Sequence, residues 1–389
     1  MLRDVTSCIY GMCEEMKGYG LAIFPAFLPR EACVLRLRAL YESRGFWRTE
    51  TAKFEDYGLY LDNKNFLGTD QILTFMDHSG RLLALKPDIT LSLAKNQPAQ
   101  ASATPEKLYY VEEVVRFSPE NRAYKVLDQI GLEWMGREDA FANLEVLDLA
   151  LRSLSLMGES AMDVSHLGFV SGLLENTGLS PLVERKVLGA IHSKSPHDVA
   201  EVLEAEGVVN SRREQILALA GIHGPFQTAL QEAKGLIRGE GMARAYAELE
   251  VLAKSLQPAQ HQTLHLDFSV VNDLDYYNGL IFRGYIRGIP GVVCSGGRYD
   301  NLMQKLGKNC RAIGFGIALH QLDTFLGAGQ RQTDLLLLYP AQCDWSALME
   351  QVRELNAQGL TVRCEREDAD ITRLSYGKLE RFGGGGNKC

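Results

Sequence analysis

The most informative part of the sequence is a pair of short strings, Asp275-Tyr276-Tyr277-Asn278-Gly279 and Ser295-Gly296-Gly297-Arg298-Tyr299-Asp300-Asn301-Leu302. Adjacent tyrosines on an extended chain turn one ring toward the core and the other toward the opposite face. In the second string, the glycines allow the backbone to come close to another group, and Arg298 supplies a rigid guanidinium fork. A glycine-rich hairpin alone would not account for both strings at their separation, so they predict part of a binding site.

Strand-like segments flank these strings and recur much earlier in the chain. The predicted strands lie at 73–76, 82–85, 108–117, 126–135, 263–271, 279–286 and 314–319. Short polar links join the first two pairs, so each pair is expected to be antiparallel. A helix at 30–44, ended by Gly45, precedes them. Residues 143–257 show helical periodicity without strand alternation, which predicts an antiparallel sheet that a helical insertion splits in sequence.

The end of the chain predicts a small further unit. A strand at 335–339, a helix at 346–358 and a strand at 360–364 precede a tail, ending at 383–386, that we expect to be loose. The fold class is therefore predicted to be α+β, in three parts. They are a core formed by 1–142 and 259–328, a helical insertion at 143–258, and a short C-terminal α/β unit with its tail at 329–389.

Composition limits the functions open to the chain. Its 389 residues, 46% of them hydrophobic, predict two or three domains with a real core. Lys and Arg number 41 against 49 Asp and Glu, and the net charge of −8 opposes the attraction on which nucleic-acid binding relies. The cysteines form no metal-binding or disulfide pattern, and no apolar run is long enough for a membrane span. We expect a cytoplasmic protein in a reducing compartment, with no metal, no cofactor, and neither nucleic acid nor a membrane as its partner.

Asp88 and Thr90 form the first polar pair that could bind a ligand. They lie in the run Leu85-Lys86-Pro87-Asp88-Ile89-Thr90, where a strand end places a carboxylate and a hydroxyl on the same side. Such a pair can hold an ammonium group. An equally good interpretation is that one of the two is the N-cap of the helix that follows.

A second polar set lies on the central strand pair. Gln129, Gly131 and Glu133 alternate with period two and therefore share one face, where Gly131 leaves room for a ligand. Arg116 lies on the preceding strand. A Gln and a Glu on a buried face would be costly without partners, which favours a binding pocket over the alternative of a solvated face.

These motifs resemble those of the catalytic core of histidyl-tRNA synthetases, which have the class II aminoacyl-tRNA synthetase fold. The resemblance covers residues 24–326, and the strings at 275–277 and 295–302 are its most specific part. It implies a histidine pocket with the following members: Asp88 and Thr90 at the amino group, Gln129 and Glu133 along the wall, Tyr276 and Tyr277 around the imidazole, and Arg116 at the α-phosphate and the ligand carboxylate.

The departures from the family pattern concern the ATP side. Where the family has an arginine three residues before the aspartate of the Asp-Tyr-Tyr string, this chain has Asn272, and Gln321 replaces the arginine of the third motif. Val126 replaces an acidic residue of the second motif, and Ala52 replaces the proline of the first. Adenylate formation needs positive charge around the reacting phosphorus, and each lost donor typically adds about 3 kcal/mol to the barrier. We therefore expect no catalytic residues.

An intact amino-acid side beside an altered ATP side resembles the regulatory subunits of ATP phosphoribosyltransferase. The resemblance implies a non-catalytic subunit that binds histidine as an effector and is required for the first step of histidine biosynthesis and its feedback control. It also implies a homodimer in a hetero-oligomer with the short-form catalytic subunit. One alternative is an active enzyme that uses ATP, either histidyl-tRNA synthetase-like or an amino-acid ligase. Another is a histidine sensor that acts on a different partner. The short C-terminal unit argues against a synthetase, because it is too small for a complete anticodon-binding domain.

Overall fold

The structure is a computed structural model that describes residues 29–63, 72–102, 104–137, 139–175, 179–208, 210–271, 276–322 and 333–383. These residues form two compact units. The larger unit is Val34–Leu322, and the smaller one includes residues 333–383.

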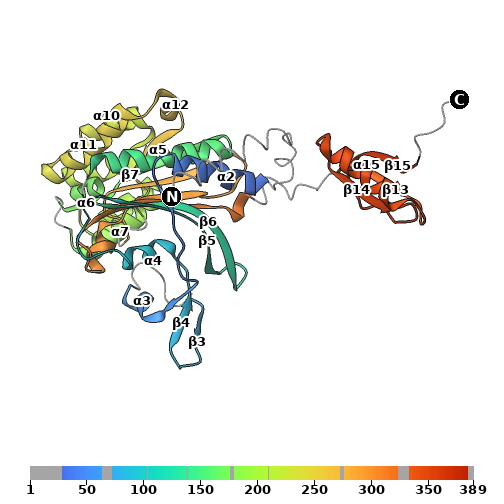
Figure 1. The fold of residues 1–389 in the computed structure, drawn as a ribbon. Coiled ribbons are helices and arrows are strands. Elements are labelled where there is room, and N and C mark those ends of the chain that lie inside the picture. Colours follow the sequence, from blue (N-terminus) through green and yellow to red (C-terminus); the bar gives the residue numbers. More distant parts are fainter. Residues whose placement is uncertain are drawn as a thin grey trace. The chain divides into compact units, whose positions relative to one another are not determined.

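A nine-stranded sheet forms the centre of the larger unit (Figure 1). In their order across the sheet, the strands are β1 (Trp47–Arg48), β5 (Glu106–Ser118), β6 (Ala123–Gly136), β12 (Arg311–Ala318), β11 (Cys294–Arg298), β10 (Leu280–Ile286), β7 (Ser160–His166), β9 (Leu264–Asp267) and β8 (His223–Pro225). Neighbouring strands are antiparallel, apart from the parallel pairs β1–β5 and β7–β9. The predicted antiparallel sheet, and with it the α+β class, is confirmed.

Helices cover both faces of this sheet. α5 (Ala140–Met157) packs on one face, where a Cβ on Gly284 would lie 2.3 Å from a methyl carbon of Leu154. α4 (Ile89–Lys95) and α13 (Asp300–Lys305) lie on the other face, where their apolar side chains join Tyr110 of β5 in one buried core. Alternate residues of a strand point to opposite faces, so β6 directs Gln129 and Glu133 together toward α4.

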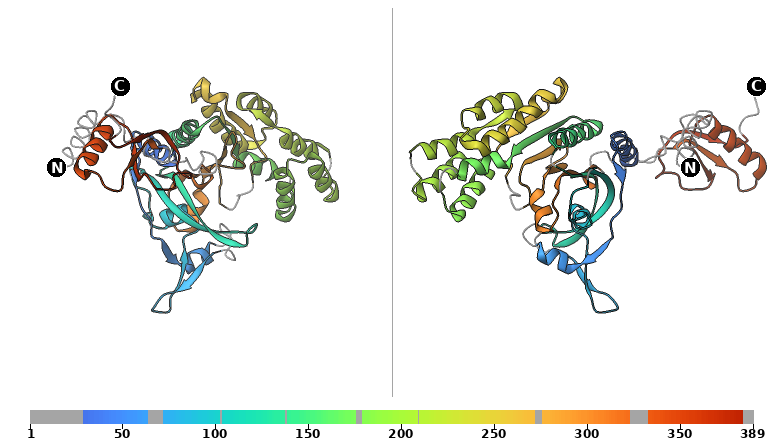
Figure 2. Two further views of the ribbon diagram at one scale, coloured as in Figure 1. Left: turned by 90° about the vertical axis from the view of Figure 1, so that its right-hand side faces the viewer. Right: turned by 60° about the vertical axis from the view of Figure 1, so that its left-hand side comes forward.

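The remaining helices of the larger unit are short to medium in length. They are α2 (Pro29–Glu42), which belongs to this unit from Val34 on, α3 (Tyr57–Asp62), α6 (Leu167–Glu175), α7 (Pro181–His192), α8 (Pro196–Ala205), α9 (Asn210–Gly221), α10 (Phe226–Lys234), α11 (Gly239–Ser255) and α12 (Pro258–His261). In both views of Figure 2, the green to yellow helices that follow β7 lie together at one side of the unit. None of the helices in the described ranges has both the length and the apolar sequence that a membrane span needs.

A small antiparallel sheet of three strands leads the chain into α4. Its order is β2 (Phe54–Asp56), β4 (Leu82–Leu85) and β3 (Thr74–Met76), so the hairpin predicted at 73–85 is present. The chain passes from β4 through Pro87 directly into the N-terminus of α4. This connection fixes where Asp88 and Thr90 lie.

The prediction of an all-helical stretch at 143–257 is wrong at two places, β7 and β8. β7 is an inner strand of the main sheet, paired with β10 and β9. Its apolar residues Met162 and Val164 are fully buried, but the alternation extends over too few positions to stand out between two helices. β8 has three residues and forms only because β9 offers an edge. How the chain divides into domains remains a prediction.

The smaller unit contains a parallel three-stranded sheet. β13 (Thr333–Tyr339) lies between β14 (Val362–Arg366) and β15 (Tyr376–Arg381), and α15 (Trp345–Ala357) joins β13 to β14. The strand, helix and strand predicted here are present. The prediction of a loose tail after residue 364 is wrong for residues 376–381, which form β15. That strand is polar and mostly exposed, so the backbone of β13 stabilises it rather than an apolar pattern in its own sequence.

Candidate functional site

A cavity of about 340 Å³ opens where the start of α4 faces β6, β12 and β11. All the residues predicted for the pocket line it: Asp88, Thr90, Arg116, Gln129, Glu133, Tyr276 and Tyr277. Six further residues line it as well, namely Tyr110, Ser295, Tyr299, Gly314, Phe315 and Gly316. Of these, Ser295 and Tyr299 belong to the string that was predicted to form part of a binding site. Side chains from distant parts of the sequence therefore meet around one space.

Glu133 lies deepest in the site, with 1% of its surface exposed. Thr90 donates a hydrogen bond from its hydroxyl to Oε1 over 2.6 Å, and Tyr299 donates to Oε2 over 2.6 Å. Burial raises the pKa of Glu133 to about 8, against the effect of these two hydrogen bonds. A Cβ on Gly314 would lie 1.7 Å from Oε2, so only glycine leaves room for this carboxyl group. The carboxyl group is thus held in position and carries a proton near neutral pH.

Asp88 is the N-cap of α4, one of the two interpretations that the sequence left open, and its side chain also lines the cavity. Its Oδ1 accepts a hydrogen bond of 2.7 Å from the backbone N–H of Leu91, so it is the N-cap of α4. Its Oδ2 lies 3.9 Å from Nη2 of Arg116, whose Nε donates to the carbonyl of Pro87 over 2.9 Å. Burial raises the pKa of Asp88, while the charge of Arg116 opposes the rise. One carboxylate therefore both caps a helix and faces the cavity.

Aromatic rings form another wall of the cavity. The ring centroids of Tyr276 and Tyr277 are 4.7 Å apart, and those of Tyr276 and Tyr299 are 6.0 Å apart. Burial raises the pKa of Tyr110, Tyr276 and Tyr299 well above the usual range. These phenols therefore stay neutral. The wall suits a flat ring that also exchanges hydrogen bonds.

The expectation for Gly131 was wrong. A Cβ at this position would lie 2.4 Å from the hydroxyl oxygen of Tyr110 and 2.3 Å from the carbonyl oxygen of Phe315. Gly131 therefore makes room for Tyr110, which is opposite it in the β5–β6 register, rather than for a ligand. Tyr110 could have been identified only from the register of the hairpin, which pairs it with Gly131.

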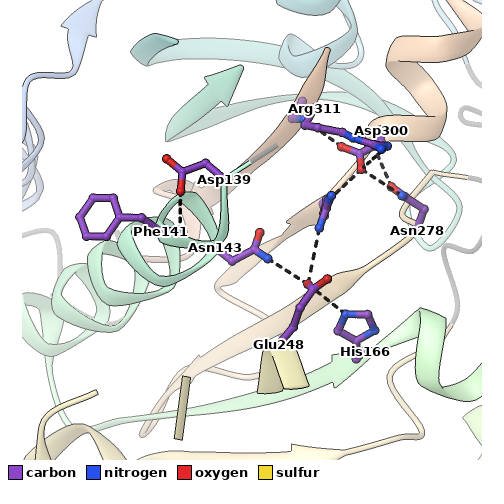
Figure 3. Close-up of polar contacts among 10 residues, drawn as sticks. Asp139, Phe141, Asn143, His166, Glu248, Asn278, Asp300 and Arg311 are labelled. Atoms are coloured by element: carbon purple, nitrogen blue, oxygen red, sulfur yellow. Dashed lines mark hydrogen bonds and ion pairs between the residues drawn. The ribbon is translucent and has the colours of Figure 1, made fainter. Parts of the chain in front are cut away.

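Arg298 does not line the cavity, because its guanidinium group pairs with Asp300 and Glu248 instead. Its Nε donates to Oδ2 of Asp300 over 2.8 Å, and its Nη1 lies 3.5 Å from Oε2 of Glu248 in α11. The Asp300 carboxylate also contacts Asn278 and Arg311 (Figure 3). Arg298 and Asp300 thus hold the backbone on either side of Tyr299. The string Ser-Gly-Gly-Arg-Tyr-Asp places a tyrosine in the site rather than a cation.

The positions that depart from the synthetase pattern supply no cation to the cavity. The side-chain amide of Gln321 donates to the carbonyl of Val292 over 3.3 Å. Val126, on the β5–β6 hairpin, is 60% exposed. Asn272 lies outside the described residues. Arg116 is the single cationic side chain among the described residues that line the cavity. In the same part of the chain, no group of three His, Cys, Asp or Glu side chains is placed to bind a metal ion.

Comparison with known proteins agrees with this fold. A family model described as histidyl-tRNA synthetase matches residues 25–322. An ATP phosphoribosyltransferase regulatory subunit from Geobacter metallireducens is 30% identical over 359 residues, which cover 86% of this chain and 80% of the relative. A crystal structure described as an ATP phosphoribosyltransferase regulatory subunit/histidyl-tRNA synthetase, from Bacillus halodurans, superposes with a TM-score of 0.77 at 24% identity, over 90% of this chain and 93% of that one. A chain of the ATP phosphoribosyl transferase (HisG:HisZ) complex from Thermotoga maritima superposes with a TM-score of 0.58 at 20% identity. The superposition covers 75% of this chain and 98% of that one.

Together, the sheet, the helices and the cavity between them define a protein built on a class II synthetase core. Within that class, the chain belongs to the histidyl-tRNA synthetase-like family of ATP phosphoribosyltransferase regulatory subunits.

Proposed function

We propose that this protein is a non-catalytic regulatory subunit of an ATP phosphoribosyltransferase and that histidine binds in the cavity around Glu133. One observation carries the proposal. The seven side chains predicted for a histidine pocket come from four separate segments of the sequence and line a single cavity of about 340 Å³. Pockets for small ligands typically have about this size or somewhat more.

The cavity offers a partner for each group of histidine. Asp88 and Arg116, 3.9 Å apart, present opposite charges side by side, as the ammonium and carboxylate of one amino acid require. Glu133 and the tyrosine wall provide a hydrogen-bonding group and flat surfaces for an imidazole. These contacts favour an aromatic, hydrogen-bonding side chain over an aliphatic one.

The same cavity is a poor site for ATP chemistry. Adenylate formation depends on preorganised positive charge at the phosphates, and one missing donor typically costs about 3 kcal/mol in the barrier. Arg116 is the single cation among the described lining residues, and the amide of Gln321 is turned toward a backbone carbonyl. Two missing donors would slow the reaction by about ten-thousandfold. A non-catalytic role follows from this loss.

The partner that we propose is the short-form catalytic subunit, with this chain as a homodimer within the hetero-oligomer. The similarity to the Geobacter regulatory subunit and to a chain of the Thermotoga complex supports such a partner. Histidine bound here would then report the end product of the pathway to the transferase. Histidine exerts control only through the difference in its affinity for the active and inactive assemblies.

The proposal is tested first on the isolated chain. Calorimetric titration is expected to detect histidine binding, and labelled pyrophosphate is expected not to exchange into ATP in the presence of histidine. Arg116→Met should weaken histidine binding at least about tenfold, since one charge-assisted contact supplies more than about 1.4 kcal/mol. The matched control is Arg152→Met, because Arg152 has a similar side-chain exposure, 40% against 43%, and pairs with Asp148 on α5 instead. Robust exchange would instead establish the alternative of an active ATP-using enzyme. Absence of histidine binding would refute the pocket.

A further inference from the structure

A second cavity, of about 350 Å³, lies at the other end of β6 and β12 and differs sharply in charge from the first. Three cationic side chains line it, those of Arg137, Lys308 and Arg311. Amide side chains of Gln100, Gln304 and Asn309 line it as well, and none of the described lining residues is acidic. In a chain of net charge −8, this is a local reversal of sign.

The wall of this cavity joins two distant parts of the chain. Gln100 and Asn309 form an isolated parallel bridge, and the side-chain amide of Asn309 donates to Oε1 of Gln100 over 3.1 Å. The backbone N–H of Ala101 donates to the carbonyl of Asn309 over 3.2 Å, and that of Asn309 donates to the carbonyl of Ala99 over 2.7 Å. These contacts hold the loop after α4 against the turn before β12. The concave shape is therefore fixed by the backbone.

Two of the three cations are also held in place. The ammonium group of Lys308 donates to the backbone carbonyl of Gln97, which is neutral and leaves the charge of the lysine uncompensated at that contact. Nη1 of Arg311 lies 3.3 Å from Oδ2 of Asp300, whose side chain is 1% exposed. Side chains that are ordered before binding lose less conformational entropy when a ligand arrives. The Asp300 carboxylate offsets part of the charge of Arg311, and the cavity is thus a preorganised set of cationic and amide donors.

We propose that this cavity binds a small phosphate-bearing anion. A phosphate group carries between one and two negative charges near neutral pH, together with several strong acceptor oxygens, and it matches cationic and amide donors gathered around one hollow. A volume of about 350 Å³ fits a small molecule and not an extended chain. Free phosphate, pyrophosphate and the phosphate of a larger metabolite share this chemistry. The site is separate from the histidine pocket and does not depend on the proposed function.

The test uses the full chain, with pyrophosphate and inorganic phosphate as probes in calorimetric titrations at constant ionic strength. The wild type is expected to bind one or both. The double variant Arg137→Met/Lys308→Met is expected to bind at least about tenfold more weakly, because the loss of a single charge-assisted contact already has about that effect. The control is Lys186→Met/Lys254→Met, which removes the same total charge from exposed helical positions. It should change the dissociation constant less than about twofold, and Glu133→Gln should leave anion binding intact.

Several results would overturn the proposal. One is the absence of measurable heat with either probe at concentrations up to about 10 mM, because a dissociation constant above that value corresponds to less than about 3 kcal/mol of binding free energy. Another is an equal weakening of anion binding in both double variants, because the anion would then be attracted by the general surface charge and not by this cavity. Binding of an acidic peptide but of neither phosphate probe would assign the cavity to a protein partner.

Discussion

Tyr299 and Glu133 are joined by a hydrogen bond of 2.6 Å in which the phenol donates to Oε2 of the carboxyl group. Thr90 donates to the other oxygen at the same distance. Tyr299 follows β11, Glu133 lies in β6, and Thr90 is in the first turn of α4. Three elements therefore fix the orientation of one carboxyl group before any ligand arrives.

Glu133→Gln is expected to weaken histidine binding at least about tenfold, a change of about 1.4 kcal/mol. The amide keeps the shape of the side chain but places an NH₂ group where Thr90 or Tyr299 now donates, and it can no longer share a proton with an imidazole. In the reconstituted transferase, the histidine concentration for half inhibition should rise by the same factor. Activity without histidine should barely change, because the proposed catalytic subunit carries out the chemistry. Unaltered inhibition in a properly folded variant would place histidine at another site.

Histidine affinity is expected to depend on pH with two limbs. Burial raises the pKa of Glu133 to about 8, so this group and a neutral imidazole hold one proton between them near neutrality. Below about pH 6.5, the imidazole of free histidine is protonated, and this proton must be released on binding. Above about pH 8, Glu133 is ionised, and a proton must be taken up on binding. The dissociation constant should therefore be lowest between these values and rise about tenfold per pH unit outside them. Glu133→Gln should remove the rise of the dissociation constant above about pH 8. Calorimetric titrations of both proteins across the pH range check this, and a rise that persists in the variant would contradict the role given to Glu133.

Gly314→Ala is expected to destabilise the protein by about 2 to 4 kcal/mol and to abolish histidine binding. The new Cβ would lie 1.7 Å from Oε2 of Glu133 and 2.5 Å from the backbone carbonyl oxygen of Leu132, and the backbone atom cannot move aside cheaply. Gly189→Ala is the matched control, because nothing outside the adjacent backbone of α7 lies within 4 Å of its Cβ position. This change should be neutral or slightly stabilising. Chemical denaturation measures the free energy of unfolding of both variants. Equal stability of the two variants would contradict the packing described for Gly314.

Homodimer formation is expected to use the segment 29–55. Within it, Phe46 is 1% exposed and belongs to the core, so the apolar surface is left to Trp47, Phe54 and Leu35, which are exposed. Trp47→Glu should shift the protein from dimer toward monomer in light scattering at micromolar concentration, because a buried charge opposes association. Trp345→Glu, at an exposed tryptophan of α15, should leave the dimer unchanged. A wild-type monomer would refute the prediction.

The sequence predicted those parts of the structure that depend on local patterns. The β5–β6 hairpin follows from alternation on either side of a short polar link, and the pocket residues were found because Asp88, Glu133 and the tyrosine string match family motifs. The role of Tyr110 was missed because it depends on the register that places it opposite Gly131. Register follows from packing along the whole strand and not from the composition of either residue.

Contacts between distant segments could not be predicted in the same way. The interaction of Arg298 with Glu248 joins β11 to α11, and nothing in either segment indicates the other. β15 was missed because its polar residues carry no apolar signal, and its stability comes from hydrogen bonds to β13. Both errors concern partners that the chain supplies from far away.

Asp300 contacts one residue that lines the second cavity and one residue adjacent to the lining of the first. Its carboxylate contacts Arg311, which lines the anion cavity, and Asn278, which directly follows the tyrosine pair of the histidine pocket. Two ligands that act on one buried carboxylate share a free energy of interaction, and such an interaction is reciprocal. An anion that tightens the hold on histidine must itself be held more tightly, by the same factor, when histidine is present. If histidine and a phosphate-bearing anion bind as proposed, Asp300 is the side chain through which the occupancy of one cavity would affect the affinity of the other.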